Sequence, residues 1–228
     1  MTDYVYCSNR EWSLQAFLGA RTSLPGTWSL CLGSEDLQPM LTRVQPRYVF
    51  FPHWSYIVPD NILVSHECVC FHMSDVPFGR GGSPLQNLIA RGHNETMLTA
   101  LRMSTEIDAG PVYFKRPLSL EGSAESIFRR AAHLCVEMMA EIVATEPPAL
   151  PQEGDPTVFK RRTPKMSVLP ETGGVDDLYD HIRMLDAPGY PHAFLHHGDF
   201  VGFLTDAHRT DDAVEAKVRF EIRKGIIR

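Results

Sequence analysis

Two imidazoles and two thiols occupy every second position of one short stretch of the chain, at His66, Cys68, Cys70 and His72. On a β-strand all four side chains would point to one face, and this set of donors first suggests zinc. Positions two apart on a strand are separated by about 6.6 Å, whereas zinc ligands lie only about 2.0–2.3 Å from the metal. We therefore interpret the cysteines as small buried packing residues and predict no metal site. Cys70 as a nucleophile beside His72 is kept as an alternative.

His72 and Asp108 form a stronger candidate for chemistry. A His with a carboxylate can move a proton and support a developing oxyanion near neutral pH. The pattern places His72 at the carboxyl end of a strand and Asp108 in an Asp-Ala-Gly turn between two strands. Ligands bind at the carboxyl ends of strands in open α/β sheets. Either residue alone is more often structural, so the hypothesis depends on the pair.

The elements that must position this pair follow from alternating β-rich and helical runs. The first part of the chain predicts helices at 11–20 and 35–42 and strands at 4–7, 28–32, 48–51 and 66–72. This order is typical of a layered α/β fold. The Gly- and Pro-rich loop 76–84 then precedes a helix at 85–90, and strands at 96–103 and 112–114 flank the turn that holds Asp108. A long helix is expected after Ser123.

Six prolines and three glycines lie between residues 146 and 174, so this stretch cannot form long regular elements. We expect a core at 1–146, a proline-rich connector at 147–174 and a small C-terminal α+β subdomain at 175–228. The subdomain should hold a helix at 175–185 and strands at 193–195, 200–204 and 214–222.

Composition limits the class of protein. The 228 residues carry 22 Lys and Arg against 28 Asp and Glu, and the resulting net charge of −6 argues against a nucleic-acid partner. No apolar run approaches the roughly 20 residues of a membrane helix, and the N-terminus lacks the features of a signal peptide. Five scattered cysteines suit a reducing compartment. We expect a cytoplasmic protein that does not act on a membrane.

Two segments then point to a known family. Residues 71–84, FHMSDVPFGRGGSP, and residues 105–111, TEIDAGP, resemble the formyltransferases that use 10-formyltetrahydrofolate. That family carries an Asn-x-His-x-Ser…Pro…Arg-Gly…Pro segment and a later Leu-Asp-x-Gly turn, and the resemblance covers roughly residues 45 to 145. Residues 161–164 and 182–194 are similar to the linker and the Arg…Tyr-Pro-x-Ala-Phe segment of the sugar N-formyltransferases.

The resemblance implies a Rossmann-like formyltransferase core and transfer of a formyl group to a primary amine, most closely that of a nucleotide-linked deoxyamino sugar. It implies that His72 stabilises the oxyanion and passes a proton, while Asp108 orients His72 and helps to deprotonate the amine. Arg80 and Gly81 would shape the loop between cofactor and substrate. The residues implied to line the pterin of 10-formyltetrahydrofolate are Asp75, Val76, Pro77, Thr105, Glu106 and Ile107, with Trp54 and Ile57 as apolar walls.

The chain departs from the family at one catalytic position, since Cys70 stands where the family has its Asn. Losing one donor to the oxyanion costs about 10²–10³ in rate, and a thiol is a poor replacement. His53 is our candidate to fill the place, because it follows the third strand and should end near the fourth. A loop His packed under Trp54 is the alternative for this residue.

Three other functions remain open from the sequence. The acceptor could be an amino acid, a hydrazine or another small biosynthetic amine. The protein could hydrolyse 10-formyltetrahydrofolate, or it could be a folate-binding module without turnover. A tRNA acceptor is disfavoured by the net charge and by the acidic C-terminal segment. Exposed strands in that segment could pair across a homodimer.

Overall fold

The computed structural model describes residues 1–222, which form two compact units. The first unit contains residues 1–84, 96–118 and 128–159, and the second contains 85–95, 119–127 and the residues from 160 onward. These limits differ from the expected boundaries at 146 and 174, because two short segments from the middle of the chain pack with the C-terminal residues. Gln86 donates to the Met184 carbonyl at 3.1 Å, and Arg183 donates to the Gly122 carbonyl at 2.9 Å.

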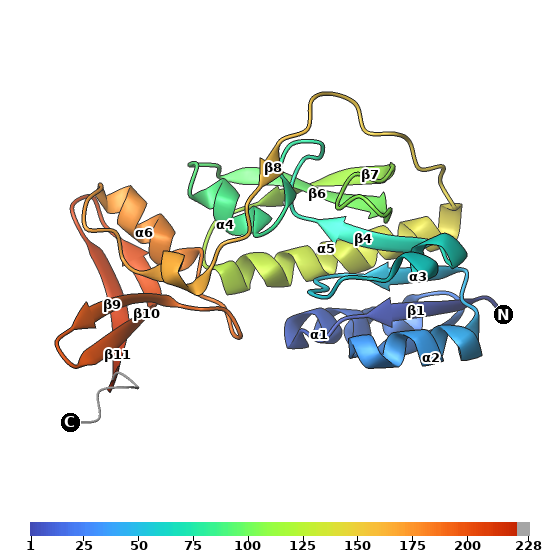
Figure 1. Ribbon diagram of the computed structural model, residues 1–228, viewed down its shortest axis with the longest axis horizontal. Helices are drawn as coiled ribbons and strands as arrows, with labels where there is room; N and C mark the ends of the chain where they lie inside the picture. Colours follow the sequence, from blue (N-terminus) through green and yellow to red (C-terminus); the bar gives the residue numbers. More distant parts are fainter. Residues whose placement is uncertain (223–228) are drawn as a thin grey trace. The chain divides into compact units, whose positions relative to one another are not determined.

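The first unit is built on a six-stranded sheet with the order β2-β1-β3-β4-β6-β7 (Figure 1). The strands are β1 (Asp3–Cys7), β2 (Thr27–Cys31), β3 (Tyr48–Phe51), β4 (Cys68–His72), β6 (Glu95–Arg102) and β7 (Val112–Ser119). β1, β2, β3 and β4 run parallel to one another, and β6 runs antiparallel to β4. The predicted α/β fold is therefore confirmed, with a sheet that is mostly parallel.

Helices cover both faces of this sheet, as a mostly parallel sheet requires. They are α1 (Glu11–Ala20), the short 3-10 helix η1 (Arg21–Ser23), α2 (Ser34–Val44), α3 (Asp60–Ser65) and α5 (Ala124–Thr145). On one face, the ring of Tyr6 from β1 stacks on Phe17 of α1 at 4.2 Å. On the other face, Leu41 of α2 and Ile62 of α3 join a buried cluster with Val5 and other strand residues. The sequence did not predict α3, because six residues are too few to show a helical period.

Two strands differ from their predicted limits. β4 begins at Cys68, so His66 precedes the strand and the four alternating ligand-type residues do not lie on one strand. β7 continues to Ser119, five residues beyond the prediction, because Lys115, Arg116 and Pro117 interrupt its apolar pattern without ending it.

The second unit contains a three-stranded antiparallel sheet with the order β11-β10-β9. Its elements are α4 (Pro84–Ile89), the 3-10 helix η2 (Pro164–Ser167), α6 (Val175–Arg183), β9 (Ala193–His197), β10 (Phe200–Arg209) and β11 (Val214–Ile222). The α+β character expected for this part of the chain is confirmed. Over residues 1–222, no helix is both long enough and apolar enough to cross a membrane.

A two-stranded ladder within the first unit joins the loop after β4 to the segment after α5. Here β5 (Arg80–Gly81) pairs in parallel with β8 (Val158–Phe159). The amides of Gly79 and Arg80 both donate to the Thr157 carbonyl at 2.9 Å. A Cβ at Gly81, which has a φ of +95°, would lie 2.7 Å from the Phe159 carbonyl oxygen, so only glycine allows this approach. The connector therefore holds the loop that follows His72.

Candidate active site

His72 and Asp108 lie side by side at the carboxyl end of β4. The His72 Nδ1 atom is 3.4 Å from Asp108 Oδ2, and the two side chains are only 9% and 15% exposed. On its other side, His72 Nε2 is 2.8 Å from the carbonyl oxygen of Gly79. Both ring nitrogens thus face acceptors, and an imidazolium could donate to both at once. The His72 ring can therefore hold a positive charge and exchange a proton with the Asp108 carboxylate.

Two buried hydroxyl groups fix the loop that bears the Gly79 carbonyl. Ser74 donates its hydroxyl to the same carbonyl at 3.1 Å, and the hydroxyl of Thr99 on β6 donates to the Ser74 carbonyl at 2.7 Å. Ser74 and Thr99 are fully buried. The orientation of His72 is therefore set by a chain of hydrogen bonds that begins in the sheet.

Asp108 stands in a constrained turn. Its φ is +53°, in the left-handed region that Asp tolerates better than most residues, and Oδ2 also accepts from the Gly81 amide at 2.9 Å. Gln152 of the connector donates to the carbonyls of Asp108 and Gly110, both at 2.8 Å. Sequence reasoning missed Gln152, because a single Gln in a proline-rich stretch carries no motif of its own.

Cys70 lies on the same sheet face as His72, two positions earlier in β4. Burial, and then the nearby Asp108 carboxylate, raise the pKa of its thiol well above the usual range. The sulfur is accordingly a protonated thiol at neutral pH, which makes it a weak donor and a poor nucleophile. This geometry speaks against the alternative of Cys70 as a nucleophile.

Comparison with known proteins places this geometry in a family. A profile for the C-terminal domain of methionyl-tRNA formyltransferase matches residues 164–221. The solved structure of methionyl-tRNA formyltransferase from Clostridium thermocellum is 35% identical, with a TM-score of 0.94 over 98% of this chain and 100% of that chain. The chain belongs to the formyltransferase family. The predicted family is confirmed, and it is a family of N-formyltransferases that take the formyl group from 10-formyltetrahydrofolate.

Two further relatives show how much of such proteins the chain matches and how widely its fold is shared. The methionyl-tRNA formyltransferase of Rickettsia massiliae is 29% identical over 113 residues, which is 48% of this chain and 37% of that protein. The chain thus matches less than half the length of such curated relatives. A sugar N-formyltransferase from Shewanella sp. shares the fold at 15% identity, with a TM-score of 0.66 over 87% of this chain and 94% of that one.

The residues that the sequence predicts to line a pterin come from two segments near the His72–Asp108 pair. Asp75, Val76 and Pro77 begin three residues after His72. Lys115 of β7 holds the first two by donating to Asp75 Oδ1 at 2.5 Å and to the Val76 carbonyl at 2.6 Å. Ile107 is 62% exposed immediately before Asp108. An exposed apolar side chain and a fixed loop beside the pair fit a planar, hydrogen-bonding ring.

The other expected site residues lie as follows. Arg80 donates to Gln152 Oε1 and is 3.5 Å from the Glu106 carboxylate, so it joins the Asp108 turn to the connector. Thr105 is exposed in the same turn. Trp54 is half-buried and packs on the same cluster as Cys70, whereas Ile57 is exposed in the loop before α3.

His53 faces a different part of the first unit. Its ring packs edge-on against Trp12 of α1 and Phe128 of α5, with centroid distances of 6.2 Å and 5.7 Å. These helices cover the sheet face opposite to the α2–α3 cluster that Cys70 contacts. Its Nε2 is shielded and has no hydrogen-bond partner among the described residues. The structure brings His72, Asp108 and Cys70 together but does not bring His53 to them.

The buried position of His53 predicts a pH-dependent stability. Burial, and then the charge of Arg10, lower its pKa to about 4 from an ordinary 6.5. The unfolded chain therefore takes up this proton at a higher pH than the folded chain, so stability is intact above pH 6.5 and is lost between pH 6.5 and 4. We expect about 2 kcal/mol less free energy of unfolding at pH 5 than at pH 7 from this group.

The variant His53→Asn tests this expectation, because Asn tolerates the positive φ of 53° and does not titrate. Urea unfolding of both proteins at pH 7 and pH 5 measures the difference. An equal loss of stability in the two proteins over this range would contradict the assignment.

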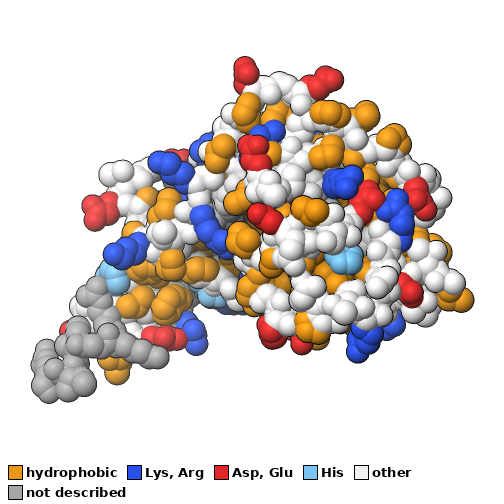
Figure 2. Space-filling model, turned by 45° about the vertical axis from the view of Figure 1, so that its right-hand side comes forward, with side chains coloured by type: hydrophobic (Ala, Val, Ile, Leu, Met, Phe, Trp, Pro, Cys, Tyr) orange, Lys and Arg blue, Asp and Glu red, His pale blue; other side chains and the backbone are white. Residues whose placement is uncertain are grey.

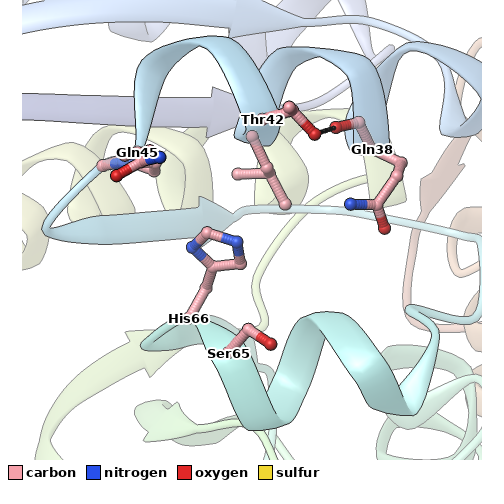
Figure 3. A pocket seen from close by; sticks show the side chains of 7 residues that line it. Gln38, Thr42, Gln45, Ser65 and His66 are labelled. Atoms are coloured by element: carbon pink, nitrogen blue, oxygen red, sulfur yellow. Dashed lines mark hydrogen bonds between the residues drawn. The ribbon is translucent and has the colours of Figure 1, made fainter.

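A pocket of about 450 Å³ lies elsewhere on the first unit (Figure 3). Its walls come from α2, through Gln38 and Thr42, and from Ser65 and His66 just before β4. Pro46, which also lines it, precedes β3. The pocket therefore opens at the amino ends of strands whose carboxyl ends lie near His72, and it is separate from the candidate active site.

Proposed function

We propose that this protein transfers a formyl group from 10-formyltetrahydrofolate to the primary amine of a small molecule, of the nucleotide-linked deoxyamino sugar class. The His72–Asp108 pair beside the Gly79–Gly81 loop, with His72 buried and Asp108 partly exposed, is the observation that carries the chemistry. 10-Formyltetrahydrofolate supplies an activated formyl group, and the loops at 75–77 and 105–107 would hold its pterin.

In this reaction the attacking amine must lose a proton, and the nitrogen that leaves the formyl carbon must gain one. Asp108 is the base for the ammonium, because its carboxylate is partly exposed and lies 3.4 Å from His72 Nδ1. Asp108 passes this proton to His72, and the resulting imidazolium gives a proton to the nitrogen that leaves the formyl carbon. Its positive charge stabilises the negative charge that develops on the formyl oxygen. The Cys70 thiol adds at most a weak donor.

The charge of the second unit supports a small acceptor over a tRNA. Residues 160–228 carry eleven Lys and Arg and eleven Asp and Glu, whereas a domain that grips nucleic acid is strongly basic. Four of these eleven cations also lie in ion pairs, namely Arg183–Asp180, Arg209–Asp176, Lys217–Asp206 and Arg219–Glu221. On the face in Figure 2, Lys and Arg side chains are interspersed with Asp and Glu and with hydrophobic side chains.

Methionyl-tRNA is the second candidate acceptor. It is favoured by the profile match over residues 164–221 and by the name of the Clostridium thermocellum relative. The two candidates share the same formyl-transfer chemistry and differ only in what presents the amine. They can therefore be separated in one assay.

The test measures tetrahydrofolate release from 10-formyltetrahydrofolate by absorbance, with a thymidine-diphosphate aminodeoxysugar, glycine, hydrazine or methionyl-tRNA as acceptor. We expect the amino sugar nucleotide to raise the release rate at least 100-fold, and His72→Asn to abolish the increase. Formylation of methionyl-tRNA alone would establish the second candidate. Release without any amine would indicate a hydrolase, and tetrahydrofolate binding without release in every mixture would indicate a binding module; each result overturns the proposal.

A further inference from the structure

We infer that Gln152 is a positioning residue for Asp108, an inference that rests on the proposed formyl transfer for its effect on rate. Gln152 lies in the connector after α5, outside every segment that resembles the family motifs. All other residues from 151 to 158 are exposed, and Gln152 alone in this range is partly buried. Its side chain is therefore turned inward from a segment that otherwise faces solvent.

The amide of Gln152 is fully used. Its nitrogen donates to the carbonyls of Asp108 and Gly110, both at 2.8 Å, and its oxygen accepts from Arg80 Nε and the Arg80 NH2 group at 3.1 Å and 2.9 Å. One side chain thereby ties both sides of the Asp108 turn to the loop after His72. A carboxylate in its place could keep Arg80 but could not donate to the two carbonyls.

Gln152 acts on a residue whose backbone conformation is unfavourable. Asp108 is a non-glycine residue with a φ of +53°, a conformation that persists only when its surroundings enforce it. The Asp108 carboxylate is fixed by the Gly81 amide, but the backbone of the turn is fixed by Gln152. The connector itself is anchored on both sides of Gln152, by Leu150 to Val112 and by Thr157 to Pro77. Gln152 is thus held in place independently of the turn it positions.

The first experiment needs no turnover. Hydrogen exchange of the peptide covering residues 104–111 is measured by mass spectrometry in the wild type, Gln152→Ala, Gln152→Glu and the control Glu153→Ala. We expect exchange in this peptide to become at least 10-fold faster in both Gln152 variants and to stay unchanged in the control. Unchanged exchange in the Gln152 variants would overturn the inference, whether or not the protein transfers formyl groups.

The second experiment measures kcat with the acceptor that supports turnover. We expect Gln152→Ala and Gln152→Glu to lower kcat by about 10- to 100-fold, with less than a threefold change in KM for 10-formyltetrahydrofolate. In the Asp108→Asn background, adding Gln152→Ala should lower kcat less than threefold further, because its effect passes through Asp108. Equal effects in both backgrounds would overturn the positioning role and leave Gln152 a general structural residue. Faster exchange in a protein with no turnover would refute the proposed function alone.

Discussion

Asp108→Asn is expected to lower kcat for formyl transfer by about 10³-fold or more, with the fold intact. Oδ2 of Asp108 serves the Gly81 amide and faces His72 Nδ1 at the same time. An Asn can place its single oxygen where Oδ2 lies and keep both partners, but it carries no negative charge to balance an imidazolium. The neutral amide also cannot accept the proton of an attacking ammonium. Steady-state kinetics with a saturating acceptor measures the loss.

The matched control for this variant is Asp155→Asn, which changes an exposed carboxylate in the connector. Its kcat should equal that of the wild type, and urea unfolding should show that Asp108→Asn keeps its stability within about 1 kcal/mol, since Asn also tolerates a positive φ. More than a tenth of the wild-type kcat in Asp108→Asn would rule out Asp108 as the base.

Gly110→Ala is expected to destabilise the first unit by about 3 kcal/mol. A Cβ on Gly110 would lie 1.8 Å from the carbonyl oxygen of Arg102, at the end of β6. Both atoms belong to the backbone or are fixed to it, so no side-chain rotation can relieve the overlap. If the turn moved away from β6 to relieve this overlap, it would strain the adjacent hydrogen bond from the Arg102 amide to the Pro111 carbonyl, which is now 2.8 Å long.

Gly19→Ala is the control for this substitution. Gly19 lies in α1, and a Cβ added to it would meet open space, so alanine should raise the free energy of unfolding by up to about 1 kcal/mol. Urea unfolding of both variants gives the comparison. A stability for Gly110→Ala within about 1 kcal/mol of the wild type would show that β6 and the turn can move apart freely.

The sequence predicted the sheet better than it predicted the site. The strands β1, β3 and β4 are short apolar runs bounded by Gly, Pro or polar residues, and such runs are visible without a structure. The His72–Asp108 pair was also predictable, because His72 ends a strand and Asp108 lies in the turn between the next two strands of the main sheet. That the two side chains come close together follows once β6 is placed next to β4 in the sheet.

Three features could not be predicted from the sequence, each for a physical reason. His53 was expected at the site because it follows β3, but its φ of +53° turns the chain and its ring packs on Trp12 and Phe128. Gln152 was missed because its role depends on where an irregular connector returns. The limits of the compact units depend on contacts far apart in the chain, such as Gln86 with Met184, which no local pattern reports.

The ladder between β5 and β8 also fixes how much of the chain a working catalytic fragment must include. A fragment ending with α5 would keep the two motif segments at 71–84 and 105–111 and every strand of the main sheet. It would lack Thr157 and Phe159, whose carbonyls hold the amides of Gly79, Arg80 and Gly82. The smallest functional module, and the natural splice point for chimaeras with other family members, therefore lies after Phe159, inside a segment that looks dispensable in sequence.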